Sequence, residues 1–512
     1  MRSTVPFVVS ADHRASEAGA AVLRGGGNAV DAAIAANAVL AVTAPHLCGL
    51  GGDLLALVYA DDEEDCLIAA GRAGARSSAS ELRAAGHRSM PLFGDPRSVT
   101  MPGCVDGLLA LHEQFGSRDL DEVFAPAIML AECGFRAEAP LAESVGRLGP
   151  AAREQLSELA GQATGPGARV RRLGVARALR AIAATGRDGF YGGEFGAGLL
   201  ELPGGTFAAP DLAVNSAGWG EPLRASAWGV ELWVAPPPSQ GYLLPASAML
   251  AASVDLPDPD DPGWAHLLIE CAAAAAHDRP AVLSDHADGA ALIASAAGRR
   301  SLVDPDRAGR RGPGGAGDTT YLCVTDGAGM GVSLIQSNAS GFGSQLVEPN
   351  TGINLHNRGL GFSLQPGHPA ELAPGRRPPH TLVPALATDE AGLRAVFGTM
   401  GGDAQPQILL QLAARLFHHA EPPAAAVAAP RWALRSDSGF DTWTSSEVSV
   451  AVEADAPAGW FNGLAEGGHR LAALPPLSSA VGHAHAIARL ADGTWAAGAD
   501  PRTVIGSVAE PG

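Results

Sequence analysis

The chain has 512 residues and a formal net charge of −19, with 46% hydrophobic and 17% charged residues. These values fit a large folded protein and exclude a disordered chain, and the acidic balance argues against nucleic acid or an anionic membrane as partner. Apart from histidine, every basic residue is arginine, so lysine Schiff-base chemistry is excluded. Six cysteines without a CxxC pair do not form a disulfide scaffold, and we expect a cytoplasmic protein.

The first part of the chain predicts two helices followed by two strands. One helix covers residues 16–24, and a second, alanine-rich helix begins at Ala29 after a GGGN turn. The segments LLALVYA and CLIAAGRAGA then predict strands. The uncharged stretch 32–52 is about as long as a membrane span. It contains asparagine, proline and histidine and ends in glycines, so we expect a buried helix and a loop instead.

The character of the chain changes near residue 319. Residues 108–303 predict a mostly helical region, interrupted by turn-rich patches, and DPDRAGRRGPGGAGD predicts a loop. Short strands are then expected at TYLCVTD, MGVSLIQSN, ALATD, LRAVFGTM and HAHAIARLADGTWAAGAD. Helices followed by strands favour an α+β or layered α/β protein. Without a clean linker, we expect one intertwined domain.

The junction GGAG-Asp318-Thr319-Thr320 carries the strongest chemical signal. A hydroxyl at the head of a strand can attack the carbonyl before it, and hydrolysis of the resulting ester frees a chain beginning at Thr319. An N-terminal threonine combines a nucleophile with a base, because its α-amino group has a pKa of about 7.7–8.0. From spacing alone, an ordinary strand start remains the commoner interpretation.

Several blocks occur in an order that is specific when they are taken together. They are ASEAGAAVLRGGGNAVDAAIAANAVLAVTAPHLCGLGGD, VTMPGCVDGLLALHEQFG, GDTTYLCVTDGAG, TGINLHNRG, GTMGGDAQPQ and ADPRTVIG. Over nearly its whole length the chain resembles the γ-glutamyltranspeptidase family of N-terminal-nucleophile hydrolases. LHNRGLGFSL and PGRRPPHTLVP look more like its transpeptidase-like amidohydrolase branch, which includes oxamate amidohydrolase. The resemblance implies an αββα sandwich, two stacked sheets between helix layers.

The resemblance also implies which residues carry the chemistry. Cleavage would occur between Asp318 and Thr319, Thr319 would be the nucleophile, and Thr320 completes the family's Thr-Thr pair in the substrate site. Ser337 falls on a family position whose hydroxyl binds the new amino terminus.

Further site residues follow from the same resemblance. Gly401 and Gly402 match the pair whose backbone N–H groups form the oxyanion hole, where only glycine allows so close an approach. Arg72 matches an arginine that clamps the substrate carboxylate, although a surface arginine is the alternative. Asn338 resembles a site asparagine but lies one residue out of register.

Three departures from the family pattern concern the substrate. Gly361 stands where transpeptidases have the aspartate that holds the α-ammonium group, and Arg358 replaces a glutamine. His380 and Thr381 replace a serine pair that fixes the glutamyl carboxylate. Loss of an anion and gain of a cation favour a second carboxylate or a polarised α-oxo group over an α-amino group, so we expect glutathione to be a poor substrate. Arg358 could instead be a turn residue, and His380 lacks a neighbouring carboxylate in the sequence to orient it as a base.

We therefore expect an enzyme of two paired fragments, 1–318 and 319–512. It would be an amidohydrolase or acyltransferase that acts on a small carboxylate-bearing amide through an acyl-enzyme, resolved by water or an acceptor amine. We expect no cofactor and no metal, because His483 and His485 share a strand face without a third ligand; a higher oligomer stays open. The alternatives are a true γ-glutamyltransferase or glutathione hydrolase, and an unprocessed binding or scaffold protein.

Overall fold

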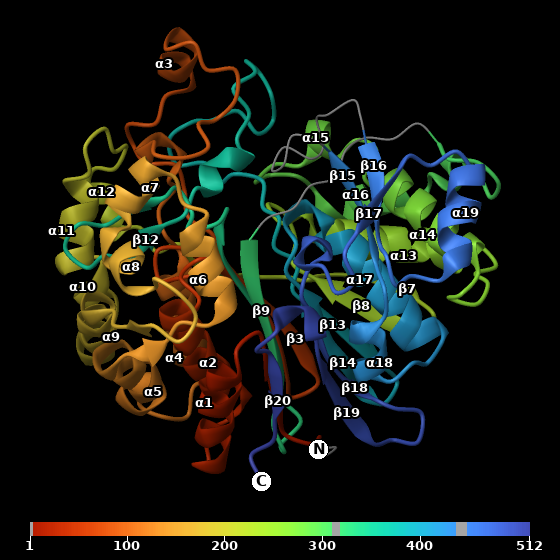
Figure 1. The fold of residues 1–512 in the computed structure, drawn as a ribbon, viewed down its shortest axis with the longest axis horizontal. Helices are drawn as coiled ribbons and strands as arrows, with labels where there is room; N and C mark the ends of the chain where they lie inside the picture. Colours follow the sequence, from red (N-terminus) through yellow and green to blue (C-terminus); the bar gives the residue numbers. More distant parts are fainter. Residues whose placement is uncertain (1–3, 310–317, 437–447) are drawn as a thin grey trace.

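Two antiparallel sheets stacked face to face form the centre of the protein in the computed structural model, which describes residues 4–309, 318–436 and 448–512 (Figure 1). The first sheet runs in the order β20 (Ser507–Ala509), β1 (Phe7–Ser10), β9 (Asp318–Thr325), β10 (Gly331–Ala339), β2 (Asp53–Ala60), β3 (Glu63–Ala69) and β6 (Ala217–Gly220). The second runs in the order β19 (Trp495–Ala499), β18 (Ala484–Arg489), β14 (Gly392–Thr399), β13 (Ala385–Asp389), β8 (Val230–Val234) and β7 (Leu223–Ala227).

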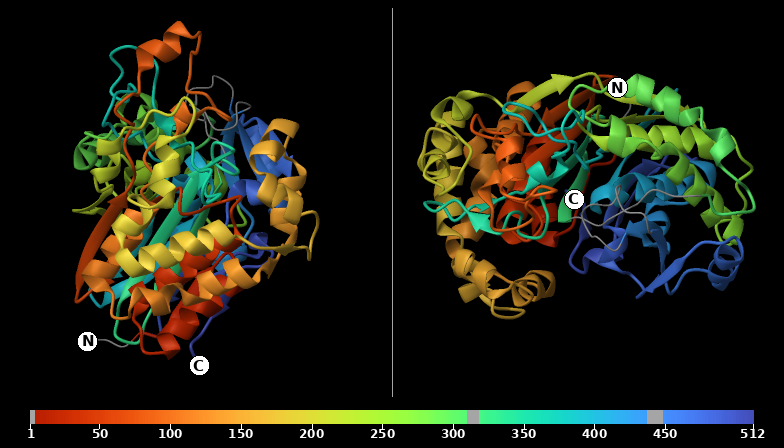
Figure 2. Two further views of the ribbon diagram at one scale, coloured as in Figure 1. Left: turned by 90° about the vertical axis from the view of Figure 1, so that its left-hand side faces the viewer. Right: turned by 90° about the horizontal axis from the view of Figure 1, so that it is seen from above.

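Helices cover the outer face of each sheet, which gives the four layers visible in Figure 1. The first sheet is covered by α1 (His13–Arg24), α2 (Ala29–Thr43), α4 (Cys104–Phe115), α5 (Leu120–Cys133) and α9 (Leu173–Thr185), the red to yellow helices in front of the strands in Figure 2, left. The second is covered by α13 (Leu243–Ala252), α14 (Pro262–Ala275), α16 (Gly289–Ala297) and α17 (Gln405–Ala413). The predicted αββα sandwich is confirmed.

The remaining elements lie around this frame. Shorter helices are α3 (Ala79–Ala84), α6 (Ala139–Gly146), α7 (Pro150–Gln155), α8 (Ser157–Gln162), α10 (Arg187–Phe190), α11 (Glu194–Leu200), α12 (Ala209–Ala213), α15 (Arg279–Val282), α18 (Pro423–Ala428) and α19 (Ala458–Glu466). Small sheets are formed by β4 (Phe135–Arg136) with β5 (Arg169–Val170), by β11 (Leu346–Val347) with β12 (Asn354–Leu355), and by β15 (Trp432–Ser436), β16 (Val448–Glu453) and β17 (Leu471–Leu474).

The strand alternation decides which side chains face the space between the sheets. Along β9, Tyr321 and Cys323 belong to the inter-sheet core, whereas Leu322 and Val324 pack toward the first helix layer. The same period of two places Leu55 and its odd-numbered neighbours of β2 between the sheets. Odd-numbered positions of β2, β9 and β10 therefore face the second sheet.

Helix α2 is buried along its whole length, which explains the uncharged stretch in the sequence. Asn28 caps it by accepting the N–H groups of Val30 and Asp31, and the Asp31 carboxylate accepts the N–H of Asn28 in return. Alanines let this helix pack closely between the first sheet and its neighbouring helices. None of the helices in the described residues combines the length and the apolar character that crossing a bilayer requires.

Both main sheets mix strands from either side of residue 318. Strands β9, β10 and β20 pair among β1, β2, β3 and β6, and β13 pairs with β8. The prediction of a mostly helical middle region was wrong between residues 217 and 234, where β6, β7 and β8 lie. These strands are short, and β6 and β7 are sheet edges, so their sequences carry little alternating apolar signal. Residues 310–317 of the predicted loop lie outside the described residues.

A substitution in β14 tests how closely the two sheets pack against each other. A Cβ added at Gly398 would lie 2.1 Å from the ring of Tyr321 in β9. We therefore expect Gly398→Ala to lower the free energy of unfolding by about 1–3 kcal/mol, because the ring must move in a packed core. Gly161→Ala in α8, where nothing lies within 4 Å, is the control and should be neutral or slightly stabilising. Urea denaturation measures the free energy of unfolding of both variants. Equal values would show that the Tyr321 ring can move away from the added Cβ without loss of stability.

Candidate active site

Three polar residues stand side by side at the ends of three neighbouring strands. Thr319 lies at the head of β9, Ser337 lies near the end of β10, and Asp53 begins β2. The register pairs Ser337 with Asp53 directly, and Gln336 with Thr320. All three odd-numbered residues face the inter-sheet side, so the strand period itself brings a hydroxyl, a second hydroxyl and a carboxylate into one row.

The two hydroxyls of this row are in contact. Thr319 Oγ1 donates to Ser337 Oγ at 3.0 Å, and both side chains are buried. The backbone N–H of Ala339 also donates to Ser337 Oγ, at 2.8 Å, across an irregularity in the β9–β10 pairing. The bulge thus fixes the orientation of Ser337 toward the predicted nucleophile.

Arg358 connects the Thr319–Ser337 hydroxyl pair to Thr381. It lies in a 3₁₀ turn, η4 (Arg358–Gly361). Its Nη2 donates to Ser337 Oγ and its Nη1 to Thr381 Oγ1, each at 3.0 Å. The side chain is 1% exposed, and burial lowers its pKa to about 10 despite the opposing effect of Asp53. Arg358 is not a turn residue that points to solvent.

The Asp53 carboxylate places a negative charge beside the hydroxyl pair and Arg358. Its Oδ2 lies 3.2 Å from His380 Nε2, 3.3 Å from His356 Nδ1 and 3.9 Å from Arg358 Nε. Its Oδ1 accepts the backbone N–H groups of Gly71 and Gly103. Burial alone would raise the pKa of Asp53, but the imidazoles of His356 and His380 outweigh it and hold the pKa below its usual range.

His380 is held in one tautomer. The N–H of Leu382 donates to His380 Nδ1 at 3.4 Å, so the ring proton lies on Nε2 and points at Asp53. Burial, and next the Arg358 cation, lower the pKa of His380 to about 4. The orienting carboxylate that its sequence neighbours lack comes from Asp53, 327 residues away.

Gly401 and Gly402 have the backbone geometry that an oxyanion hole needs. Their φ angles are +140° and +55°, and a Cβ at Gly401 would lie 3.0 Å from Ile408. Within the described part of the chain, no hydrogen bond occupies either amide N–H. Gln240 Nε2 donates to the carbonyls of both Gly402 and Thr381, which ties this turn to the Arg358 side of the site.

A cleft of about 850 Å³ reaches Arg358 and Thr381, which border the hydroxyl pair. Arg358, Thr381 and Asp403 line its inner part, and Asp403 is paired with Arg279 at 2.9 Å. The exposed Arg88 lies at its outer part. The guanidinium groups of Arg88, Arg279 and Arg358 therefore line this cleft. Its carboxylate, Asp403, is already paired with Arg279.

Three predicted site residues have their side chains elsewhere. Thr320 faces the helix side of β9, where its hydroxyl lies 3.4 Å from the Gln336 carbonyl. Asn338 donates to the Pro45 carbonyl at 3.4 Å. Arg72 is 37% exposed and donates to the Gly375 carbonyl, with Asp285 at 3.5 Å. The described contacts do not bring these side chains to Thr319, and their roles stay predictions.

Gly361 has no room for the family's aspartate. It lines the cleft, and a Cβ there would lie 2.3 Å from the backbone oxygen of Pro379. The close approach of two backbone segments therefore excludes any side chain at this position unless the loop moves.

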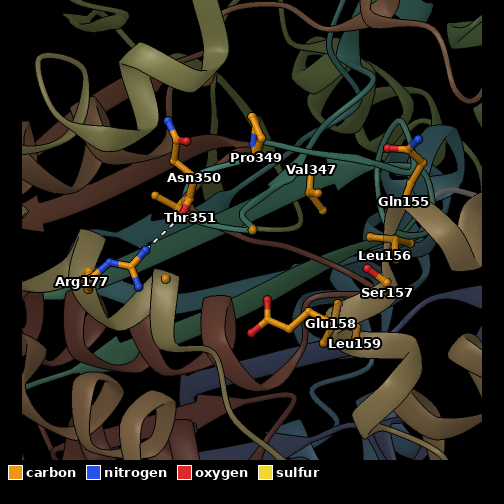
Figure 3. Close-up of a pocket in the computed structure, with 12 residues that line it drawn as sticks. Gln155, Leu156, Ser157, Glu158, Leu159, Arg177, Val347, Pro349, Asn350 and Thr351 are labelled. Atoms are coloured by element: carbon orange, nitrogen blue, oxygen red, sulfur yellow. Dashed lines mark hydrogen bonds between the residues drawn. The ribbon is translucent and has the colours of Figure 1, made fainter. Parts of the chain in front are cut away.

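A second, smaller hollow of about 310 Å³ lies between α7, α8 and residues 347–352 (Figure 3). Arg177 there donates to the Asn350 carbonyl and to Glu194, and Thr351 binds Glu348. These polar groups are engaged with one another, and the hollow shares no lining residue with the larger cleft.

Asp53 and His356 were missed by the sequence analysis. A signal was present, because Asp53 is a charge that opens the otherwise apolar strand DLLALVYA, and His356 lies in the INLHNRG block. A buried charge at a strand end needs a partner, and a search for that partner would have pointed to the histidines.

The chain is similar to known proteins over nearly its whole length. The model of the family described as Gamma-glutamyltranspeptidase matches residues 15–509. The chain is 34% identical to the oxamate amidohydrolase proenzyme of Klebsiella pneumoniae, over 98% of each chain. It is 31% identical to the acylase ACY 1 proenzyme of Pseudomonas sp. (strain SE83), covering 99% of this chain and 95% of that one.

A solved structure has the same fold. The cephalosporin acylase of Bacillus halodurans superimposes with a TM-score of 0.88 at 30% identity, over 99% of this chain and 96% of that one. The resemblance seen in the sequence is thereby confirmed, and the chain is an enzyme that belongs to the gamma-glutamyltranspeptidase family.

Proposed function

We propose that the chain is a proenzyme that cuts itself before Thr319 and then hydrolyses, or transfers the acyl group of, a small amide that carries a carboxylate. The observation that carries this proposal is the buried Thr319–Ser337–Arg358 series, with 3.0 Å between the successive polar atoms. An autoprocessing amidohydrolase or acyltransferase is also what the family and the relatives named above indicate.

The self-cleavage uses the same hydroxyl as the later reaction. Thr319 Oγ1 attacks the carbonyl carbon of Asp318, the C–N bond to Thr319 breaks, and an ester forms. Water hydrolyses this ester, which leaves the Asp318 carboxylate and a free α-amino group on Thr319. The name proenzyme on two of the relatives supports processing into two chains, and the interleaved strands would hold the fragments together.

In the mature enzyme Thr319 Oγ1 attacks the substrate amide, and the α-amino group takes its proton and passes it to the leaving amine. The N–H groups of Gly401 and Gly402 would stabilise the tetrahedral oxyanion. Ser337 holds the nucleophile's hydroxyl in place. Water then resolves the acyl-enzyme in hydrolysis, and an amine resolves it in transfer.

The surroundings of the cleft favour an anionic acyl donor. Arg358 places a desolvated guanidinium next to the nucleophile, where a carboxylate would form a charge-assisted hydrogen bond. Gly361 leaves the α-ammonium of a γ-glutamyl substrate without its aspartate and gives no space to add one. The name of the Klebsiella relative, oxamate amidohydrolase, supports an amide that carries a carboxylate.

Replacement of the nucleophile tests both reactions together. We expect Thr319→Ala to block cleavage and turnover, because one hydroxyl serves both steps. Thr319→Ser keeps a hydroxyl and should still cleave, giving fragments 1–318 and 319–512. Denaturing intact mass spectrometry measures cleavage, and release of ammonia from carboxylated amides measures turnover. Cleavage of the alanine variant would place the nucleophile elsewhere and contradict the proposal.

Replacement of Arg358 tests the substrate class. Arg358→Gln should raise KM for a carboxylated amide about 10- to 100-fold, because a hydrogen bond to a charged group contributes about 1.5–3 kcal/mol. Arg88→Gln, at the exposed part of the cleft, should change KM much less. The steady-state kinetics include the corresponding uncharged amide. An equal loss on that amide would mean that Arg358 only positions Ser337.

The histidine beside Asp53 should make stability depend on pH. His380 has a pKa of about 4 in the folded protein, against about 6.5 when unfolded. Between these values the unfolded chain binds more protons, so the free energy of unfolding falls as the pH is lowered from about 6.5 to about 4. Urea denaturation should show a shallower fall in His380→Asn than in the unchanged protein. Equal slopes would show that His380 does not titrate in this way.

A further inference from the structure

A second buried group of potential ligands lies outside the active site, between α14 and the loop that follows α19. His266 and Glu270 are four residues apart on α14 and therefore lie on the same face. His469 follows α19 and reaches the same point, 203 residues further along the chain than His266. The side chains are 6%, 2% and 6% exposed, in that order.

The ligand atoms of the three residues converge. One ligand atom from each residue lies within 4.8 Å of the others, and His266 Nδ1 is 2.7 Å from His469 Nε2. The two imidazole rings meet edge to face, with 4.9 Å between their centroids. At a tetrahedral zinc ion with bonds of about 2.0–2.1 Å, ligand atoms are about 3.3 Å apart. Small side-chain movements would therefore bring the three atoms to coordinating distance.

The surroundings of His266 are those of a metal-binding imidazole. Its Nε2 lies 2.9 Å from the carbonyl oxygen of Asp304, which can only accept a hydrogen bond. The ring proton is therefore on Nε2, and the Nδ1 lone pair points toward His469. A backbone carbonyl that fixes the tautomer in this way is a common partner of metal-bound histidines.

From this arrangement, we propose that His266, Glu270 and His469 bind one divalent transition metal ion, with Zn²⁺ as the preferred occupant. Two imidazoles and a carboxylate form a ligand set that zinc accepts, with water as the fourth ligand. For His469 Nε2 to act as a ligand, its ring proton moves to Nδ1, so both imidazoles bind the ion as neutral ligands. The dication would offset the buried Glu270 carboxylate.

The position of the site gives the ion a structural role. The N–H of Gly309 donates to Glu270 Oε2 at 3.0 Å, and the N–H of Ala308 donates to the Gly467 carbonyl at 2.8 Å. The site thus holds the last described residues before the segment that leads to Thr319. His266 and Glu270 precede Thr319 in the chain and His469 follows it, so the ion would join the two fragments of the processed enzyme. That role depends on the proposed cleavage, whereas metal binding itself does not.

Calorimetric titration of the purified, chelator-dialysed full-length protein with Zn²⁺ tests the proposal. We expect one ion per chain, and at least 100-fold weaker binding in both His266→Ala and His469→Ala. His418→Ala, an exposed histidine outside the site, should bind as the unchanged protein does. Zinc that binds equally well to all three variants, or not at all to the unchanged protein, would overturn the site.

Two further measurements separate loss of ligands from loss of folding. His469→Gln keeps a polar side chain in place, and it should keep the thermal unfolding midpoint of the metal-free protein while losing the increase that Zn²⁺ produces. Co²⁺ should give visible absorption bands in the unchanged protein and not in His469→Gln. The same titration in Thr319→Ala should still bind zinc, so a failure of the proposed cleavage is distinguishable from a failure of the metal site.

Discussion

The buried carboxylate of Asp53 is the constraint around which the candidate active site is arranged. It stands in the row with Ser337 and Thr319 on the inter-sheet face, and it supplies negative charge to a region that also contains Arg358. A guanidinium that is 1% exposed needs such a charge nearby, because an unpaired buried cation costs several kcal/mol. Asp53 therefore helps Arg358 to remain charged beside the pair Thr319–Ser337.

Asp53 also explains why the neighbouring residues His380 and Thr381 have different contacts. Thr381 lines the cleft and accepts a hydrogen bond from Arg358. His380, next to it in sequence, points to the opposite side and donates to Asp53. One residue thus faces the cleft and its neighbour supports the charge behind it. These contacts couple Arg358, His380 and Thr381, and Gly361 stands where the family resemblance implies an aspartate that binds an ammonium group.

The residues of this site that the sequence analysis named come from the family resemblance, and local strand periodicity explains why two of them meet. Thr319 and Ser337 fall on the same face because strands alternate, and the glycine pair follows a clear strand. The contact of Asp53 with His380 spans 327 residues and exists only because two sheets stack, so no local pattern encodes it. Arg72 shows the opposite limit: family register predicts its backbone position, but its guanidinium lies against Gly375 and Asp285. Long flexible side chains are directed by neighbours that only the fold supplies.

The interleaving of strands explains how a chain can break at its own active site without falling apart. Strand β9 begins at Asp318, yet it lies between β1 and β10 in the middle of the first sheet. The proposed cleavage before Thr319 would leave the β9–β10 backbone pairing from Thr320 to Thr325 in place, and β8 would still pair with β13 in the second sheet. The proposed reaction would therefore break one peptide bond at the head of a strand and leave the core between the sheets intact. In the proposed reaction the new amino terminus would arise beside Ser337, so the catalytic base would be created inside a preformed site.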